Sequence, residues 1–442
     1  MRPTPPQPSL SRREFVHLAA GAVAGAALSA RGQEGMKPIP PVAGSDRLKV
    51  GIIGCGGRGT GSTNNVLKAD KAAVVWSMGD IFQDRLDGCL KSLHEEFQEG
   101  FDARVEAPAD RRFIGFDAYQ RVLDSGVDLV MLTAHPHFRP QHLEAAVSAG
   151  KHVFAEKPMG VDAPGLVRVR DAARQAREKS LTLLSGFCWR YADAERATVG
   201  KLHEGAIGDV VTVHSTYHTS TLPKIPRKPA WSDVEFQIRN WWHFAWVSGD
   251  HIVEQAVHSV DRLNWLMKDK APSRCVCLGG RAAREGVESG HVFDHFAVVY
   301  EYDDGRRAFL TTRQIDGAPS DNSDYVYTTR GRAEINGWKP IHTLRDPSGG
   351  VVWKYEGQRR DMYQNEIDVL VDSIRNARAH NDGEFMVQSS MMAVMGRMAA
   401  YTGQTIGWDQ AWKSVERLGP ETYEFGPLAT PPVAIPGKTK FV

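Results

Sequence analysis

Three side chains beyond the middle of the chain have the types and the spacing that proton transfer requires. Glu254 and His258 are four residues apart and Asp261 follows three residues later, so a helix would place all three on one face. A carboxylate beside a histidine can orient the imidazole and hold its pKa in the range used for proton transfer. Glu254 and His258 are therefore candidate catalytic residues.

A lysine stands directly at the end of a short apolar run. Residues 152–155 (HVFA) have the composition of a buried strand and are followed by Glu156, Lys157 and Pro158. A lysine in a cleft can orient a substrate hydroxyl, titrate with a shifted pKa, or form an ion pair. Lys157 is therefore the third candidate catalytic residue.

A glycine-rich stretch near the start of the chain could bind phosphate. Residues 49–61 (KVGIIGCGGRGTG) join an apolar run to a cluster of glycines, as a buried strand leading into a phosphate-binding turn requires. In the G-x-G-x-x-G spacing, the first glycine allows a tight turn and the second lets the backbone approach a pyrophosphate. The third lets the following helix, whose N-terminal N–H groups would face the phosphates, pack on the strand. The candidate cofactor residues of this stretch are Gly54, Gly56, Gly57, Arg58 and Gly59.

An acidic residue follows the next apolar run. Asp80 comes just after residues 72–78 (AAVVWSM), about 20 residues beyond the last glycine of the motif. A carboxylate at this position accepts hydrogen bonds from an adenosine ribose and would repel a 2′-phosphate. We therefore expect NAD as the cofactor and disfavour NADP.

Apolar runs alternate with helical segments through the first part of the chain. Such alternation predicts βαβ units and a parallel sheet whose ligand lies at the carboxyl ends of the strands. Thr133, His135 and Glu156 stand at such strand ends and are further candidate cofactor residues. The expected strands are residues 72–78, 127–133, 152–155 and 181–185, and the expected helices are 81–99, 116–123, 141–149 and 163–179.

The second part of the chain contains mainly alternating strand patterns. Residues 292–302 and 307–314 flank Asp303-Asp304-Gly305, which is a hairpin signal. Further strands are expected at 209–220, 324–329, 332–336 and 351–355, and helices at 362–377 and 387–402. The segment 223–247 is rich in tryptophan, whose rings could pack on the apolar face of a sugar. The predicted fold class is α/β, with an N-terminal Rossmann domain and a C-terminal α+β domain that has a large, mostly antiparallel sheet.

The start of the chain resembles an export signal. Paired arginines within SRREFV (11–16) precede an apolar run rich in alanine and glycine, as in a twin-arginine signal peptide. We therefore predict a periplasmic or otherwise exported protein. The expected segments are a signal peptide (1–32), a linker (33–46), a Rossmann domain (47–187), an α+β substrate and oligomerisation domain (188–412), and a C-terminal extension (413–442).

Composition excludes several classes of partner and of stabilisation. With 442 residues and a net charge of +1, the chain has no excess of basic residues for binding nucleic acid or an anionic membrane. Its five cysteines are an odd number and do not indicate a disulfide framework. A metal site remains an alternative, because His251, Glu254 and His258 are spaced to share one helical face. Redox chemistry with a dinucleotide needs no metal, and we predict none.

The chain resembles the glucose-fructose oxidoreductase, inositol dehydrogenase and rhizopine-catabolism (Gfo/Idh/MocA) family. The resemblance covers residues 49–412 and rests on the glycine loop, Asp80, the run AGKHVFAEKP (149–158) and the segment around His258. It implies a dehydrogenase fold, a nicotinamide cofactor, a carbohydrate substrate and a homo-oligomer formed through the second-domain sheet.

The resemblance also implies roles for individual residues. Lys157 would contact both cofactor and substrate, and His258 would be the general acid/base, assisted by Glu254. Trp189 and Arg190 would approach the cofactor from the second domain.

Two departures from the family pattern concern these residues. Glu254 and Ala256 replace the usual Asp and Gly of Asp-x-Gly-x-His-x-x-Asp. The usual Thr-Pro on the preceding strand-end loop is replaced by Thr-Ala-His-Pro (133–136), with Arg139 near the position of the usual histidine.

Three functions follow from these observations. The first is an exported NAD-dependent oxidoreductase that acts on a sugar, glycoside or polyol hydroxyl, in which Lys157 holds the hydroxyl and His258 accepts its proton. The second is a redox-neutral glycosidase that oxidises, eliminates, hydrates and re-reduces its substrate, and it is distinguished by glycoside cleavage without net NADH. The third is a sugar-binding protein that keeps a cofactor without turnover.

Overall fold

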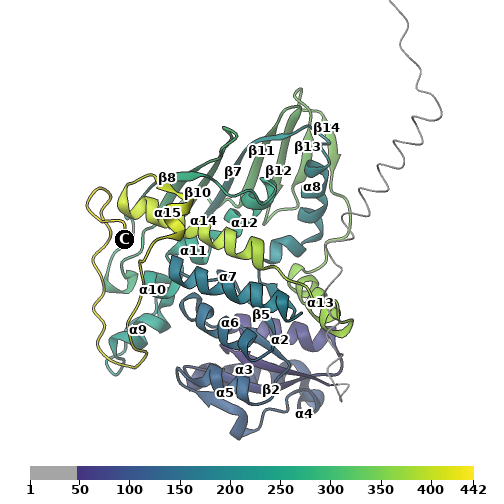
Figure 1. Ribbon diagram of the computed structural model, residues 1–442, viewed down its shortest axis with the longest axis vertical. Coiled ribbons are helices and arrows are strands. Elements are labelled where there is room, and N and C mark those ends of the chain that lie inside the picture. Colours follow the sequence, from purple (N-terminus) through teal and green to yellow (C-terminus); the bar gives the residue numbers. More distant parts are fainter. Residues whose placement is uncertain (1–46) are drawn as a thin grey trace, which may run out of the picture. The chain divides into compact units, whose positions relative to one another are not determined.

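The computed structural model describes residues 47–442, which form a six-stranded and a nine-stranded sheet with helices packed against them (Figure 1). The predicted signal peptide (1–32) and linker (33–46) lie outside the described residues. Within the described part of the chain, no helix is long and apolar enough to cross a membrane.

The first sheet is wholly parallel, because helical segments connect its successive strands. Its order is β3-β2-β1-β4-β5-β6, so the direction of strand addition reverses between β1 and β4. In a parallel sheet, that reversal opens a crevice at the carboxyl ends of the strands. The strands are β1 (Leu48–Ile53), β2 (Ala73–Asp80), β3 (Arg112–Ile114), β4 (Leu129–Leu132), β5 (His152–Ala155) and β6 (Leu183–Ser185).

Alternate side chains of these strands enter two separate cores. Val50 and Ile52 of β1 pack with apolar residues of α2, α3 and α13, whereas Ile53 packs with apolar residues of α5, α6 and α7. Both faces are therefore covered, which explains why the strands are nearly continuous apolar runs. These helices and the short α4 are α2 (Gly57–Ala69), α3 (Gln83–Phe97), α4 (Phe101–Arg104), α5 (Ala118–Asp124), α6 (Arg139–Ser148), α7 (Ala163–Glu178) and α13 (Met362–Arg375).

The second sheet is antiparallel except for the pair β7 and β10. Its order is β14-β13-β12-β11-β7-β10-β9-β8-β15. The strands are β7 (Val210–Thr219), β8 (Arg274–Gly280), β9 (His295–Glu301), β10 (Arg307–Gln314), β11 (Ser323–Thr328), β12 (Gly331–Asn336), β13 (His342–Arg345), β14 (Val351–Lys354) and β15 (Ile406–Gly407).

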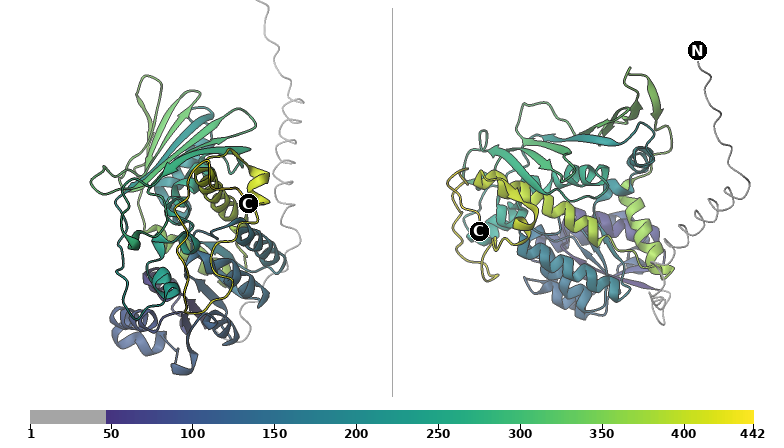
Figure 2. Two further views of the ribbon diagram at one scale, coloured as in Figure 1. Left: turned by 90° about the vertical axis from the view of Figure 1, so that its left-hand side faces the viewer. Right: turned by 45° about the horizontal axis from the view of Figure 1, so that its top comes forward.

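One face of the second sheet packs on α12 and α14 (Figure 2). The other face follows the period of two and exposes apolar side chains, among them Leu278 and Phe309. Helices α12 and α14 share one apolar core with α6 and α7, so the core is continuous between the two sheets. The remaining helices are α8 (Asp193–His203), α9 (Asp233–Arg239), α10 (Ala245–Ser248), α11 (His251–Glu254), α12 (Val257–Leu266), α14 (Gly383–Thr402) and α15 (Trp408–Trp412).

The observed architecture confirms the predicted fold class, including the hairpin of β9 and β10 around Gly305. Strands β3, β13 and β15 were not expected, because each is short and lacks a clear alternating pattern. Residues 413–442 contain neither helix nor strand, and Figure 1 shows this segment passing from α15 to the level of α9 and back.

Candidate active site

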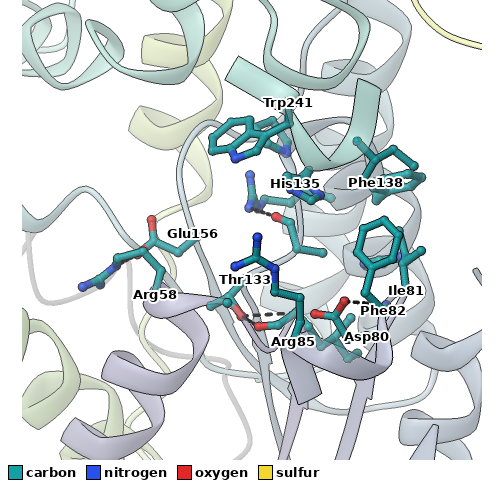
Figure 3. Close-up of a pocket in the computed structure, with 18 of the residues that line it drawn as sticks. Arg58, Asp80, Ile81, Phe82, Arg85, Thr133, His135, Phe138, Glu156 and Trp241 are labelled. Atoms are coloured by element: carbon teal, nitrogen blue, oxygen red, sulfur yellow. Dashed lines mark hydrogen bonds and ion pairs between the residues drawn. The ribbon is translucent and has the colours of Figure 1, made fainter. Parts of the chain in front are cut away.

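A cavity of about 510 Å³ lies at the carboxyl ends of the parallel strands. Its lining runs from the glycine loop after β1 and Asp80 after β2 to Lys157 after β5 and Glu254 on α11. Figure 3 shows Asp80 and Phe82 on one side, the Arg58–Glu156 pair on the other, and Trp241 above them. The structure therefore brings most of the predicted cofactor residues, with Gly59, Trp189 and Arg190 as exceptions, and two of the three predicted catalytic residues into one cavity.

The glycine loop has the shape that a dinucleotide pyrophosphate requires. Gly54 has φ +98°, and a Cβ there would lie 2.3 Å from the main-chain nitrogen of Ala134. A Cβ on Gly59 would lie 2.0 Å from the carbonyl oxygen of Gly54. Both positions therefore exclude every side chain, because the backbone atoms that they approach cannot yield.

Gly56 and Gly57 differ from these two glycines because they border open space. Both line the cavity, and a Cβ at either position would meet no atom within 4 Å. Gly56 caps α2 without a side-chain hydrogen bond, so the helix presents unpaired N–H groups and the positive end of its dipole to the cavity. The residues present thus fit a dinucleotide pyrophosphate at this helix N-terminus.

Asp80 lines the cavity at the end of β2. Its Oδ2 accepts a hydrogen bond from the Cys55 N–H at 2.6 Å, and its Oδ1 accepts one from the Phe82 N–H at 2.9 Å. Burial raises the pKa of Asp80 against these two hydrogen bonds and the charge of Arg85. Each carboxylate oxygen keeps a second lone pair that can accept a ribose hydroxyl.

The side chain of Arg58 forms ion pairs with two acidic residues. Its Nε lies 2.8 Å from Oε1 of Glu156, and its Nη2 lies 3.6 Å from Oε1 of Glu366. Glu366 of α13 is fully buried, and burial, reinforced by Glu156, raises its pKa well above the ordinary range. The sequence analysis did not identify Glu366 as a partner of Arg58, because it lies within an ordinary amphipathic helix.

Lys157 and Glu254 meet at the inner end of the cavity. The Nζ of Lys157 donates a hydrogen bond to the main-chain oxygen of Glu254. The carboxylate of Glu254 is buried, and its Oε1 has no hydrogen-bond partner among the described residues. Burial raises the pKa of Glu254 to about 7, against the opposing charges of Lys157 and Arg284. Glu254 can therefore exchange a proton near neutral pH.

The expected single helix through Glu254 and His258 is wrong. Helix α11 ends at Glu254 and α12 begins at Val257. In a continuous helix the His258 N–H would donate to the Glu254 carbonyl, but Lys157 occupies that carbonyl and His258 N donates to Gln255 O at 3.3 Å. The hydrogen bond from Lys157, at a distant strand end, thus coincides with the break between the two helices.

His258 is consequently placed differently from Glu254. It is not among the residues that line the cavity, and its ring lies edge-on to Phe187 with the ring centres 6.4 Å apart. Its Nδ1 is buried and lacks a hydrogen-bond partner within residues 47–442. Burial and the nearby charge of Lys157 lower the pKa of His258 well below its ordinary value, so the ring is neutral at pH 7.

The metal alternative has no matching geometry in the described chain. His251 points into the core, where its Nδ1 lies 3.3 Å from Phe293 O and its ring packs against Phe296. Across residues 47–442, no three His, Cys, Asp or Glu side chains are grouped so that they could hold an ion.

Trp189 and Arg190 do not line the cavity. The guanidinium of Arg190 makes ion pairs with Asp261 at 2.9 Å and with Asp269 at 2.6 Å. Trp189 lies beneath the guanidinium of Arg262 at 5.2 Å. Asp261, which the sequence grouped with Glu254, therefore pairs with Arg190 instead of serving the proposed proton transfer.

The unusual loop after β4 supports the cavity through three of its residues. Thr133 Oγ1 donates to Gly54 O at 2.6 Å and so holds the glycine loop. His135 lines the cavity beside Trp241, and burial lowers its pKa to about 3, which keeps the ring neutral. Arg139 is buried, also lines the cavity, and donates to Ala134 O and Pro158 O, so it joins two strand-end loops.

Several lining residues could not be recognised from the sequence. Trp241 and Trp242 belong to the tryptophan-rich segment for which sugar packing was suggested, and both line the cavity. Other lining side chains carry no motif and come from loops and from α3 and α9: Phe82, Arg85, Phe116, Phe138, Ile225 and Arg239.

Comparisons with known proteins agree with this geometry. Residues 48–187 match the profile described as "Oxidoreductase family, NAD-binding Rossmann fold", and residues 199–334 match the "GFO/IDH/MocA C-terminal domain". Inositol 2-dehydrogenase 3 of Saccharopolyspora erythraea is 25% identical over 343 residues, which are 75% of this chain and 86% of that protein. The mouse trans-1,2-dihydrobenzene-1,2-diol dehydrogenase is 27% identical over 50% of this chain and 59% of its own length.

Solved structures show the same fold. Scyllo-inositol dehydrogenase from Lactobacillus casei, crystallised with NAD(H) and scyllo-inositol, has a TM-score of 0.62 at 19% identity and covers 82% of this chain and 100% of its own. The aldose-aldose oxidoreductase from Caulobacter crescentus has a TM-score of 0.62 at 17% identity, covering 82% of this chain and 99% of its own. With two matching profiles and a site of the corresponding design, the chain belongs to the Gfo/Idh/MocA family of NAD(P)-dependent oxidoreductases.

Proposed function

We propose that the chain oxidises a ring hydroxyl of a cyclic polyol or sugar, with NAD as the hydride acceptor. The observation that carries the proposal is the single cavity that begins at the glycine loop and ends at Lys157 and Glu254. The relatives described above are named as dehydrogenases of inositols and of a dihydrodiol, which are ring alcohols. The tryptophans at the cavity wall suit the apolar face of such a ring.

The preference for NAD over NADP is inferred from Asp80. When bound, the nicotinamide supplies the chemistry of hydride acceptance. Gly56 and Gly57 would hold its pyrophosphate and Asp80 its adenosine ribose. A buried carboxylate at that place disfavours a further phosphate, although Arg85 also lines the cavity nearby.

Lys157 is proposed to orient the reacting hydroxyl. Its ammonium group has three N–H donors, of which the Glu254 carbonyl uses one. A remaining donor can bind the substrate oxygen and stabilise the negative charge that develops when its proton leaves.

Glu254 is proposed as the proton acceptor in place of His258. It lines the cavity beside Lys157, and its free Oε1 can receive the hydroxyl proton. A base is most effective when its pKa lies near the working pH, which Glu254 satisfies and His258 does not. His258 lies outside the cavity lining and is neutral, so it is not assigned the proton.

A comparison of two lysine variants tests this function. We expect Lys157→Met to lower kcat/KM for NADH formation from inositols or sugars by about 100-fold or more, while Lys151→Met, at the start of the same strand, keeps wild-type activity. Both variants should melt at similar temperatures. Wild-type turnover in Lys157→Met would refute the assignment. Glycoside cleavage without NADH accumulation would instead support the redox-neutral alternative, which no observation here favours.

We also propose a homo-oligomer formed through the outer face of the second sheet. That face exposes large apolar side chains, namely Val276, Leu278, Phe309 and Tyr327. Replacing Leu278 and Phe309 by lysine should release monomers in analytical ultracentrifugation. An unchanged sedimentation coefficient would place the interface elsewhere.

A further inference from the structure

One end of the cavity is bounded by three aromatic rings, which we call the aromatic rim: Phe82, Phe116 and Phe138. They follow β2, β3 and β4 and therefore belong to the parallel sheet domain. Asp80, the proposed ribose ligand, lies two residues before Phe82, and Figure 3 shows Phe82 and Phe138 on the same side of the cavity as Asp80, so the rim lies beside the place where an adenosine would bind.

Helix α9, which belongs to the C-terminal part of the chain, contacts this rim. The guanidinium of Arg239 lies 3.8 Å from the ring centre of Phe82 and also lines the cavity. Its Nη2 makes a hydrogen bond of 3.0 Å to Asp84 at the start of α3, and its Nη1 makes one of 3.1 Å. Arg239 thus connects α9 to the nucleotide domain across the edge of the cavity.

The C-terminal segment adds a second layer outside the rim. Phe425 stacks on Phe82 with ring centres 5.9 Å apart and contacts Phe116 at 5.2 Å. Tyr423 contacts Phe138 at 5.3 Å, and its hydroxyl makes a hydrogen bond of 2.8 Å with His137. Aromatic residues from two ends of the chain therefore pack into one cluster.

Isolated hydrogen bonds hold this segment in place. On the sheet-domain side, the Leu418 N–H donates to Oδ2 of Asp162 at 3.0 Å. On the α9 side, the Val234 N–H donates to Gly426 O at 3.2 Å and the Gln237 amide donates to Leu428 O at 2.8 Å. The Leu428 N–H also donates to Oδ2 of Asp233 at 3.0 Å. Because none of these hydrogen bonds belongs to a strand ladder, opening of the segment would break no hydrogen bond within either sheet.

We propose that α9 and residues 418–428 form a cover that retains the dinucleotide in its site from one turnover to the next. The Arg239–Asp84 pair ties the cover to α3, and the rings of Tyr423 and Phe425 tie it to the rim. A bound adenosine can leave past the rim when these contacts break, so release is limited by opening of the cover. The inference rests on the dinucleotide site of the proposed function, but not on the identity of the substrate.

The release rate of NADH tests the cover. Wild-type protein is loaded with NADH and mixed with excess NAD, and the loss of bound-nucleotide fluorescence is followed by stopped flow. We expect the double variant Tyr423→Ala/Phe425→Ala to release NADH at least tenfold faster than wild type. Glu424→Ala, which removes the exposed side chain between the two rings, should release it at the wild-type rate.

A second variant tests the cover without changing residues 418–428, so that misfolding of that segment cannot explain the result. Arg239→Gln removes the link to Asp84 from the other half of the cover and should also speed release, with a melting temperature close to that of wild type. Equal release rates in wild type, the double variant and Arg239→Gln would overturn the cover. Failure of wild-type protein to bind NADH at all would instead overturn the dinucleotide site itself.

Discussion

The assignment of Glu254 as the proton acceptor leads to a pH profile that can be measured directly. Burial raises its pKa from the ordinary 4.5 to about 7, which corresponds to about 3 kcal/mol of disfavour for the charged form. The carboxylate is the active form in the oxidation direction. Activity should therefore rise with pH, with roughly half of the enzyme in the active form at pH 7 and about a tenth at pH 6.

Three variants separate the two candidate bases. Glu254→Gln keeps the shape of the side chain but cannot accept the proton, so we expect kcat to fall about 100- to 10,000-fold and the dependence on pH near 7 to disappear. Glu254→Asp retains a carboxylate and should keep a weaker pH-dependent activity. His258→Asn should reduce activity but leave the pH dependence near 7, because His258 is already neutral there.

The assay is the initial rate of NADH formation with saturating NAD between pH 5.5 and 8.5, on a substrate identified in the polyol and sugar screen. Melting curves over the same range show whether a variant is folded. The reasoning would be refuted if Glu254→Gln kept the wild-type pH profile, or if His258→Asn alone removed the dependence near pH 7. Either result would indicate His258 as the proton acceptor, as the sequence predicted.

Three further predictions follow from the cavity. Gly57→Val should abolish NADH binding without loss of folding, because its side chain would occupy open cavity space. A Cβ on Gly61 also meets no atom within 4 Å, but Gly61 lies outside the cavity lining, so Gly61→Val should bind NADH normally in a fluorescence titration. Asp80→Asn should raise kcat/KM for NADP relative to NAD by about tenfold or more, and an unchanged ratio would remove Asp80 from cofactor selection. The positive charge of Arg284 lowers the pKa of Glu254, so Arg284→Gln should shift the pH–activity profile to higher pH than in wild type. Arg284→Lys keeps the charge and should leave the profile nearly unchanged.

The local sequence determined the nucleotide half of the site. Gly54, Gly56 and Gly59 were predicted from their spacing within a few consecutive residues, although the structure shows that Gly54 is also required by the close approach of Ala134. The positions of Asp80 and Lys157 follow from the ends of buried strands, and the carboxyl ends of parallel strands always meet at one edge of the sheet. These predictions needed no knowledge of distant contacts.

Only the tertiary structure led to the proposed roles of Glu254 and His258. Their spacing predicted a shared helical face, but the helix is interrupted between them, where Lys157, 97 residues earlier than Glu254, donates to the Glu254 carbonyl. Arg190 was likewise predicted to bind the cofactor, but in the structure its guanidinium is paired with Asp261 and Asp269. A side chain's pKa and availability depend on its burial and partners, and both are set by residues far away in the sequence.

The same reason explains why the cover could not be predicted. Tyr423 and Phe425 stand in a proline-rich segment with no periodic pattern, and nothing near them in the sequence identifies Phe82, Phe116 or Phe138 as their partners. Short local patterns thus led to the proposed dinucleotide site. Contacts between distant parts of the chain led to the proposals that Glu254 takes the proton and that α9 and residues 418–428 enclose the cofactor.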